Sequence, residues 1–182
     1  MKFTNEVSTT KSYKQRLPGI TTMIFDVDGV FTDGMVTVMP DGQLLRRLSA
    51  KDAYALQYAI KQDMRVAIIT GSNSMSVADS LRHLGVKHVF LQSSNKLSVY
   101  EKFIEDHDIS DEEILYMGDD IPDYAVLSRT GVSTCPADAG EEVKRICHYV
   151  SRKNGGNGCV RDVIEQTLRA QNKWFGDDAL IW

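Results

Sequence analysis

Short apolar runs alternate with longer amphipathic segments along most of this chain. Runs such as Thr22–Phe25, Val66–Ile69 and Ile114–Met117 are mostly apolar, as is typical of strands buried on both faces of a sheet. Between them, residues 73–84 and 95–107 place apolar side chains at helical spacing. This alternation predicts a doubly wound, Rossmann-like α/β fold, with a mostly parallel sheet covered by helices on both faces.

The remaining expected elements follow the same order. The segments Met35–Met39 and Gln43–Leu48 flank the turn signal Pro40-Asp41-Gly42, which predicts a β-hairpin flap over 35–48. Further helices are expected over 52–63, 121–129, 139–146 and 159–172, and further strands over His88–Leu91, Gly131–Thr134 and His148–Val150. We therefore expect one domain over 1–182, with a loose N-terminal arm over 1–20 and a C-terminal tail over 155–182.

Charge and composition exclude several classes of function. The chain has 21 Lys and Arg against 25 Asp and Glu, a net charge of -4, which argues against a nucleic-acid or anionic-membrane binder. No apolar run reaches the roughly 18 residues of a membrane span, and the first residues lack the apolar core of a secretory signal, so we expect a cytoplasmic protein. The three Cys and four His show no metal-ligand spacing, so oxygen atoms should hold any metal.

The polar motifs follow the expected strands, and ligands in parallel α/β sheets bind at the carboxyl ends of strands. The motifs are Asp26 and Asp28, then Thr70-Gly71-Ser72, then Lys96 at a helix start, then Asp119, Asp120 and Asp123. Each motif alone is as well explained by a turn, a cap or a surface charge. Together, at one edge of a sheet and in this order, they predict an active site.

Phosphoryl transfer is the chemistry that these residue types suit. The carboxylates of Asp26 and Asp119 would repel each other unless a cation lay between them, and Mg²⁺ prefers such oxygen ligands. Asp26 is the expected nucleophile, and Asp28 the expected acid and base. The Thr70 hydroxyl and the N–H groups of Gly71 and Ser72 would bind phosphate oxygens, and Lys96 would supply a positive charge.

The stretch FDVDGVFTDG, with ITGS, Lys96 and GDDIPD, resembles the haloacid dehalogenase superfamily of phosphatases. Within it, the hairpin after TDG, SAKDAYAL, QSSNKL and GGNGCVRDV are similar to the 3-deoxy-D-manno-octulosonate 8-phosphate phosphatases. The resemblance implies that Mg²⁺ is held by the side chains of Asp26 and Asp119 and by the carbonyl of Asp28. It also implies that Asp120 and Asp123 stand behind these ligands, and that the enzyme acts in lipopolysaccharide biosynthesis.

The motif spacing leaves no room for a cap domain. From Asp26 to Thr70 there are 44 positions and from Lys96 to Asp119 there are 23, each filled by expected core elements. A capless site is open to water, so another element should close it. The resemblance implies a homotetramer in which hairpins pack centrally and the tail, with Gly155, Gly156, Gly158 and Arg161, closes a neighbour's site. The alternative is that the tail packs on its own subunit.

The resemblance makes the substrate an acidic keto-sugar phosphate. Octulosonate 8-phosphate is favoured, and a sialic-type nonulosonate 9-phosphate is the alternative, because Ser72-Asn73 matches neither the Arg of the first group nor the Glu of the second. Candidates for contact with the sugar carboxylate or the phosphate are Arg46, Arg47, Lys51 and Arg161, and a surface charge explains any one of them equally well.

Three other functions share part of this pattern. A two-component receiver domain uses similar residues, but it places its Lys after the paired acids, whereas here Lys96 precedes Asp119-Asp120. A catalytically idle scaffold or binding homologue is disfavoured by the complete set of motifs. A phosphomutase or phosphotransferase stays open, although Asp28 as an internal base favours water as the acceptor.

Overall fold

The computed structural model describes residues 11–181 and places six parallel strands in one sheet, in the order β5-β4-β1-β6-β7-β8. The strands are β1 (Thr22–Phe25), β4 (Arg65–Ile69), β5 (His88–Phe90), β6 (Ile114–Met117), β7 (Val132–Cys135) and β8 (Tyr149–Val150). In the register of the sheet, Phe25 lies beside Ile68 and Met117, so β1, β4 and β6 end at the same edge. The predicted parallel sheet is confirmed.

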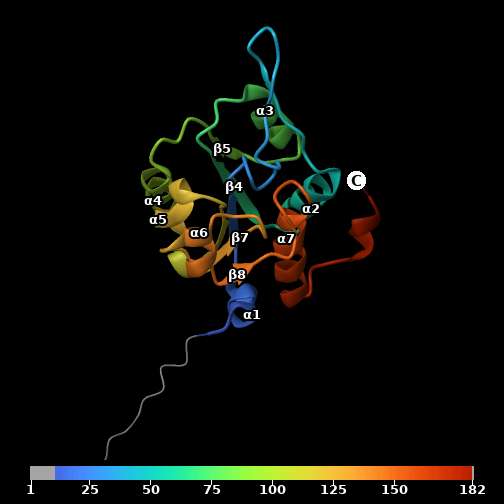
Figure 1. The fold of residues 1–182 in the computed structure, drawn as a ribbon. Coiled ribbons are helices and arrows are strands. Elements are labelled where there is room, and N and C mark those ends of the chain that lie inside the picture. The colour runs from blue at the N-terminus through green and yellow to red at the C-terminus, as the bar shows by residue number, and fades with distance from the viewer. Residues whose placement is uncertain (1–10, 182) are drawn as a thin grey trace, which may run out of the picture.

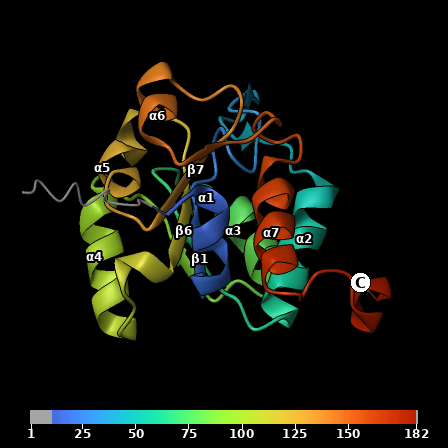
Figure 2. The ribbon, with the colours of Figure 1, turned by 90° about the horizontal axis from the view of Figure 1, so that it is seen from below.

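Helices cover both faces of the sheet, as Figure 2 shows. One face carries α2 (Ala50–Lys61), α3 (Met75–His83) and α7 (Cys159–Ala170). The other carries α4 (Lys96–His107), α5 (Tyr124–Leu127) and α6 (Glu141–Ile146). The short elements are α1 (Tyr13–Arg16) and the 3₁₀ turns η1 (Leu17–Gly19), η2 (Asp111–Glu113), η3 (Ile121–Asp123) and η4 (Asp177–Leu180).

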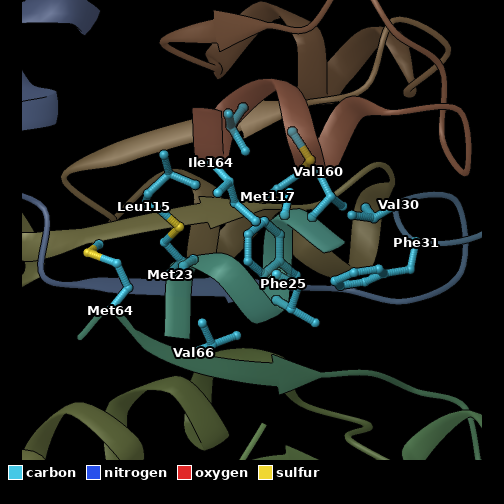
Figure 3. Packing of buried hydrophobic residues seen from close by; sticks show 14 of the residues in the cluster. Met23, Phe25, Val30, Phe31, Met64, Val66, Leu115, Met117, Val160 and Ile164 are labelled. Atoms are coloured by element: carbon cyan, nitrogen blue, oxygen red, sulfur yellow. The ribbon is translucent and has the colours of Figure 1, made fainter. Parts of the chain in front are cut away.

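The two helical layers create two cores, because successive side chains of a strand point to opposite faces. Met23 and Phe25 of β1 pack toward α7, whereas Ile24 belongs to the core beside α4. Figure 3 shows the first core, with Met23, Phe25, Leu115 and Met117 from the sheet and Val160 and Ile164 from α7. All of these side chains are fully buried.

The expected loose arm over 1–20 is wrong for its second half. Residues 1–10 lie outside the described residues, but from Ser12 onward the chain forms α1 and η1. Leu17 and Ile20 are buried in the core, and the Arg16 side chain donates a hydrogen bond to the carbonyl of Gly131 at 2.8 Å. These apolar side chains and this long-range contact fix the segment on the domain.

The segment over 155–182, expected as a tail, contains a core helix. The carboxylate of Asp52 in α2 accepts hydrogen bonds from the backbone N–H groups of Gly158 at 3.1 Å and Arg161 at 2.7 Å, and so caps the start of α7. Beyond α7 the chain returns to α2, where the carbonyl of Ala179 accepts from Tyr54. Within this chain the segment therefore packs against α2; residue 182 is not described.

The hairpin is shorter than expected. Its strands, β2 (Thr37–Val38) and β3 (Leu44–Leu45), pair antiparallel as a separate two-stranded ribbon. In Figure 1 the ribbon stands away from the sheet, drawn in light blue above α3. The expected helix over 121–129 is also shorter: it begins as the 3₁₀ turn η3 and continues directly into α5, which ends at Leu127.

Candidate active site

The predicted motifs meet around one cavity of about 470 Å³ at the carboxyl edge of the sheet. It is lined by Asp26, Asp28, Gly29, Gly34, Thr70, Gly71, Ser72, Ser93, Ser94, Lys96, Asp119, Asp120, Pro122 and Asp123. The aligned ends of β1, β4 and β6 explain this convergence, because each motif is the first segment after its strand. Elements far apart in the sequence therefore build a single site.

Lys96 is the buried cation of this site. Its Nζ lies 2.8 Å from Oδ2 of Asp26 and 2.7 Å from Oδ1 of Asp123. Asn95 accepts from the N–H of Ser98 and so starts α4 at the point that places Lys96 in its first turn. Although burial opposes it, the carboxylates of Asp26 and Asp123 raise the pKa of Lys96, so the ammonium stays charged.

Asp123 is held from several sides. Its Oδ1 accepts from Lys96 and from the hydroxyl of Tyr116 at 2.5 Å, and its Oδ2 accepts from the N–H of Asp119 at 3.3 Å. Both carboxylate oxygens of Asp123 therefore already accept hydrogen bonds from neighbouring groups. Tyr116 was missed by the sequence reasoning, because its position in β6 is that of an ordinary core residue.

The donor set fits a hard divalent cation. Carboxylate oxygens of Asp26, Asp119 and Asp123 lie within 4.8 Å of one another. Among residues 11–181, Oδ1 of Asp26 is buried without a hydrogen-bond partner, and such an atom is expected to have one. Since Asp123 is already engaged, Asp26 and Asp119 are the side chains with oxygens to offer. A Cβ on Gly29 would lie 2.0 Å from Oδ2 of Asp119, so only glycine leaves this space open.

The pKa values of Asp26 and Asp119 also favour a cation at this site. Burial and the nearby Asp123 raise the pKa of Asp26 to about 6, against the opposing effect of Lys96. Burial and repulsion from Asp26 and Asp123 raise the pKa of Asp119 to about 7. It is costly to ionise these two carboxyl groups side by side, and a bound cation would relieve the repulsion between them.

The phosphate-binding wall is partly preorganised. Thr70 is buried, and its Oγ1 accepts a hydrogen bond from the N–H of Ser72 at 3.2 Å. The N–H of Ser72, predicted to face phosphate, is thus occupied in this conformation. Ser93 and Ser94 add hydroxyls from the loop after β5. They were missed, although the rule about strand ends that found Thr70 applies to them equally.

Of the other predicted residues, the structure places Asp120 at this cavity and Lys51 and Arg161 away from it. Asp120 lines it but is exposed. Lys51 is exposed on α2 and is absent from the cavity lining within residues 11–181. Arg161 is absent from it too: its guanidinium lies over Trp174 and pairs with Glu165 at 3.4 Å. Within one chain, Lys51 and Arg161 therefore lie outside the lining of this cavity, and their contact with a substrate stays a prediction.

A hairpin residue reaches the site in an unpredicted way. The guanidinium of Arg46 binds both carboxylate oxygens of Asp28, with Nε 2.7 Å from Oδ1 and Nη2 3.1 Å from Oδ2. Arg46 was a candidate for the substrate's acid group, and its pairing with Asp28 depends on how the hairpin folds back.

The site lies at the edge of a doubly wound sheet and combines Asp26 after β1, the buried Lys96 and the acids after β6. This is the architecture of a phosphoryl-transfer enzyme without a cap domain. A model of haloacid dehalogenase-like hydrolases matches residues 88–164. The chain is 36% identical over 166 residues to the 3-deoxy-D-manno-octulosonate 8-phosphate phosphatase of Yersinia pestis, covering 91% of this chain and 89% of that protein. This chain therefore belongs to the haloacid dehalogenase-like hydrolases and is a phosphatase.

Other relatives agree. The phosphatase of the same description from Escherichia coli K12 is 37% identical over 151 residues, covering 83% of this chain and 80% of that protein. The crystal structure of the Moraxella catarrhalis phosphatase, in complex with a magnesium ion, a phosphate ion and KDO, has a TM-score of 0.87 at 30% identity. It covers 93% of this chain and 95% of that chain. Among residues 11–181, no helix is both long and apolar enough to cross a membrane.

Proposed function

We propose that the chain is a magnesium-dependent phosphatase for an acidic keto-sugar phosphate, with 3-deoxy-D-manno-octulosonate 8-phosphate as the favoured substrate. The observation that carries the reaction is the buried, unpartnered Oδ1 of Asp26 beside Lys96 and Asp119 at the cavity. The substrate class is supported by relatives at 36 to 37% identity whose descriptions name this sugar phosphate. The metal is supported by the donor set.

The first half-reaction moves the phosphoryl group to the enzyme. An oxygen of Asp26 attacks phosphorus, so that an Asp26–phosphorus bond forms while the ester P–O bond breaks. The carboxyl group of Asp28 donates a proton to the ester oxygen, which leaves as the sugar hydroxyl. Lys96 offsets negative charge at Asp26, and the Thr70 hydroxyl faces the phosphate oxygens.

The second half-reaction returns the enzyme to its starting state. Water attacks phosphorus, its proton passes to the carboxylate of Asp28, and the bond to Asp26 breaks to release inorganic phosphate. Mg²⁺, held by the side chains of Asp26 and Asp119 and by the carbonyl of Asp28, would supply positive charge for the phosphate. Asp28 thus serves as an acid first and as a base second.

Phosphate release tests this proposal. We expect turnover of octulosonate 8-phosphate with Mg²⁺, loss of turnover in EDTA, and loss in Asp26→Asn, whose shape is unchanged. The surface variant Asp79→Asn, with a side chain 55% exposed, is the matched control and should retain activity. Undiminished turnover in EDTA or in Asp26→Asn would refute the mechanism. The same assay is carried out with nonulosonate 9-phosphate, and faster turnover of that compound would make it the proposed substrate instead.

We also propose that the hairpin packs against a second copy of the chain, within a homotetramer. Met35, Val38 and Leu45 are 72%, 69% and 50% exposed, an apolar surface of a kind that marks association sites. The segment after 155 packs on its own subunit, so it gives no support to closure by a neighbour's tail. Sedimentation of the wild type against Val38→Asp tests the interface, and an unchanged oligomer would refute it.

A further inference from the structure

One side chain that follows the hairpin strands binds a residue of the active site. Arg46 follows β3, and its guanidinium forms a two-pronged ion pair with Asp28 at 2.7 and 3.1 Å. The Arg46 side chain is only 7% exposed, whereas the adjacent Leu45 is 50% exposed. A buried guanidinium that binds both oxygens fixes the plane and direction of a carboxylate.

Asp28 has little else to hold it in place. Its side chain is 36% exposed, and within residues 11–181 its other hydrogen bond is a long one, from the hydroxyl of Thr32 at 3.4 Å. Gly29, which follows it, has a φ of +81°, so the loop backbone turns sharply at this point. A half-exposed Asp without a strong partner samples several rotamers, whereas proton transfer requires the carboxyl within hydrogen-bond reach of the reacting oxygen.

We propose that Arg46 is a positioning residue, which aims the carboxyl of Asp28 at the reacting oxygens and so links catalysis to the placement of the hairpin. The inference rests on the proposed function, because Asp28 is the acid and base there. It assigns Arg46 to the enzyme's own machinery, whereas the sequence offered it as a contact for the substrate's acid group.

Steady-state kinetics of Arg46→Met with p-nitrophenyl phosphate test the inference. Nitrophenolate leaves without a proton donor. Since kcat/KM covers only the steps up to formation of the phosphoenzyme, kcat/KM for this substrate should be unchanged. Hydrolysis of the phosphoenzyme still needs Asp28 and should become the slow step. We therefore expect kcat and KM to fall together, about tenfold, and the first turnover to release a burst of nitrophenolate. With octulosonate 8-phosphate, whose leaving oxygen needs a proton, kcat/KM should also fall about tenfold.

Three further variants make the result specific. Arg46→Lys should restore part of the lost kcat, because an ammonium can hold one oxygen of Asp28. Arg82→Met should behave as the wild type, because the Arg82 side chain is 44% exposed on α3 and pairs with Asp79. The double variant of Arg46→Met with Asp28→Asn should be no slower than Asp28→Asn alone, since Arg46 acts through Asp28.

Several results would overturn the inference. An equal fall of kcat/KM on both substrates without a burst indicates a general structural role. A loss confined to the sugar phosphate indicates direct contact with the substrate, and additive losses in the double variant indicate independent action. If the wild type with Mg²⁺ released phosphate from neither substrate, the proposed function itself would fail, and this inference with it.

Discussion

Asp119→Asn is expected to make the metal-free protein more stable while it removes activity. Burial, with repulsion from Asp26 and Asp123, raises the pKa of Asp119 from 3.8 to about 7. The folded state therefore resists ionisation of this carboxyl, whereas the unfolded chain ionises it freely. Asn has nearly the same shape and no charge, so the substitution removes the penalty and leaves the packing in place.

The sign and size of the change in the free energy of unfolding follow from this raised pKa. Stability from a group of this kind is fully present below its unfolded pKa and is lost as the pH rises through the folded value. At pH 8 the full loss corresponds to about 4 kcal/mol. Because Asp119 keeps part of its hydration, we expect Asp119→Asn to gain about 2 to 3 kcal/mol at pH 8 and about 1 kcal/mol at pH 5.

Urea unfolding in EDTA at pH 5 and pH 8 measures both values. The exposed Asp106→Asn is the matched control, because Asp106 pairs with Lys102 on the surface of α4. Added Mg²⁺ should stabilise the wild type at pH 8 more than at pH 5, since protons compete for the carboxylates, and it should not stabilise Asp119→Asn. A variant that is no more stable than the wild type at pH 8 would refute the electrostatic reasoning.

Two other substitutions test neighbouring parts of the account. Gly29→Ala should abolish both activity and the thermal shift caused by Mg²⁺, because its Cβ would lie 2.0 Å from Oδ2 of Asp119. Gly42→Ala, at a similar φ of +83° but in open space, is its control, and equal effects of the two would point to backbone strain alone. Asp52→Ala should lower the free energy of unfolding by about 2 kcal/mol through loss of the cap on α7. An unchanged urea midpoint would contradict that role for Asp52.

The sheet and the centre of the site could be predicted because local signals determine them. The runs Thr22–Phe25 and Ile114–Met117 are strands with the bounds that the apolar pattern predicts, since charged or small residues end both. The polar residues that follow these strands then lie close together, because parallel strands end at the same edge of the sheet. Asp26, Lys96 and Asp119 were found in this way, without any knowledge of side-chain contacts.

The contacts that depend on long-range packing could not be predicted. Arg46 meets Asp28 only because the hairpin folds back over the loop after β1, and Tyr116 meets Asp123 from inside a strand. The segment after 155 was expected to be a tail because the family resemblance implies that it reaches a neighbour's site. Instead, the N–H of Gly156 donates to the carbonyl of Val30 at 2.9 Å, and a Cβ on Gly155 would lie 2.0 Å from the carbonyl oxygen of Gly29.

The central claim is that Asp26 carries the phosphoryl group, and chemical trapping tests it most directly. The wild type, with Mg²⁺ and octulosonate 8-phosphate, is quenched during turnover and treated with borohydride, which reduces an acyl phosphate to an alcohol. Peptide mass spectrometry then locates the reduced side chain. Reduction is expected at Asp26 alone, and only when substrate is present. Reduction at Asp28 or Asp119, or no reduction during active turnover, would contradict it.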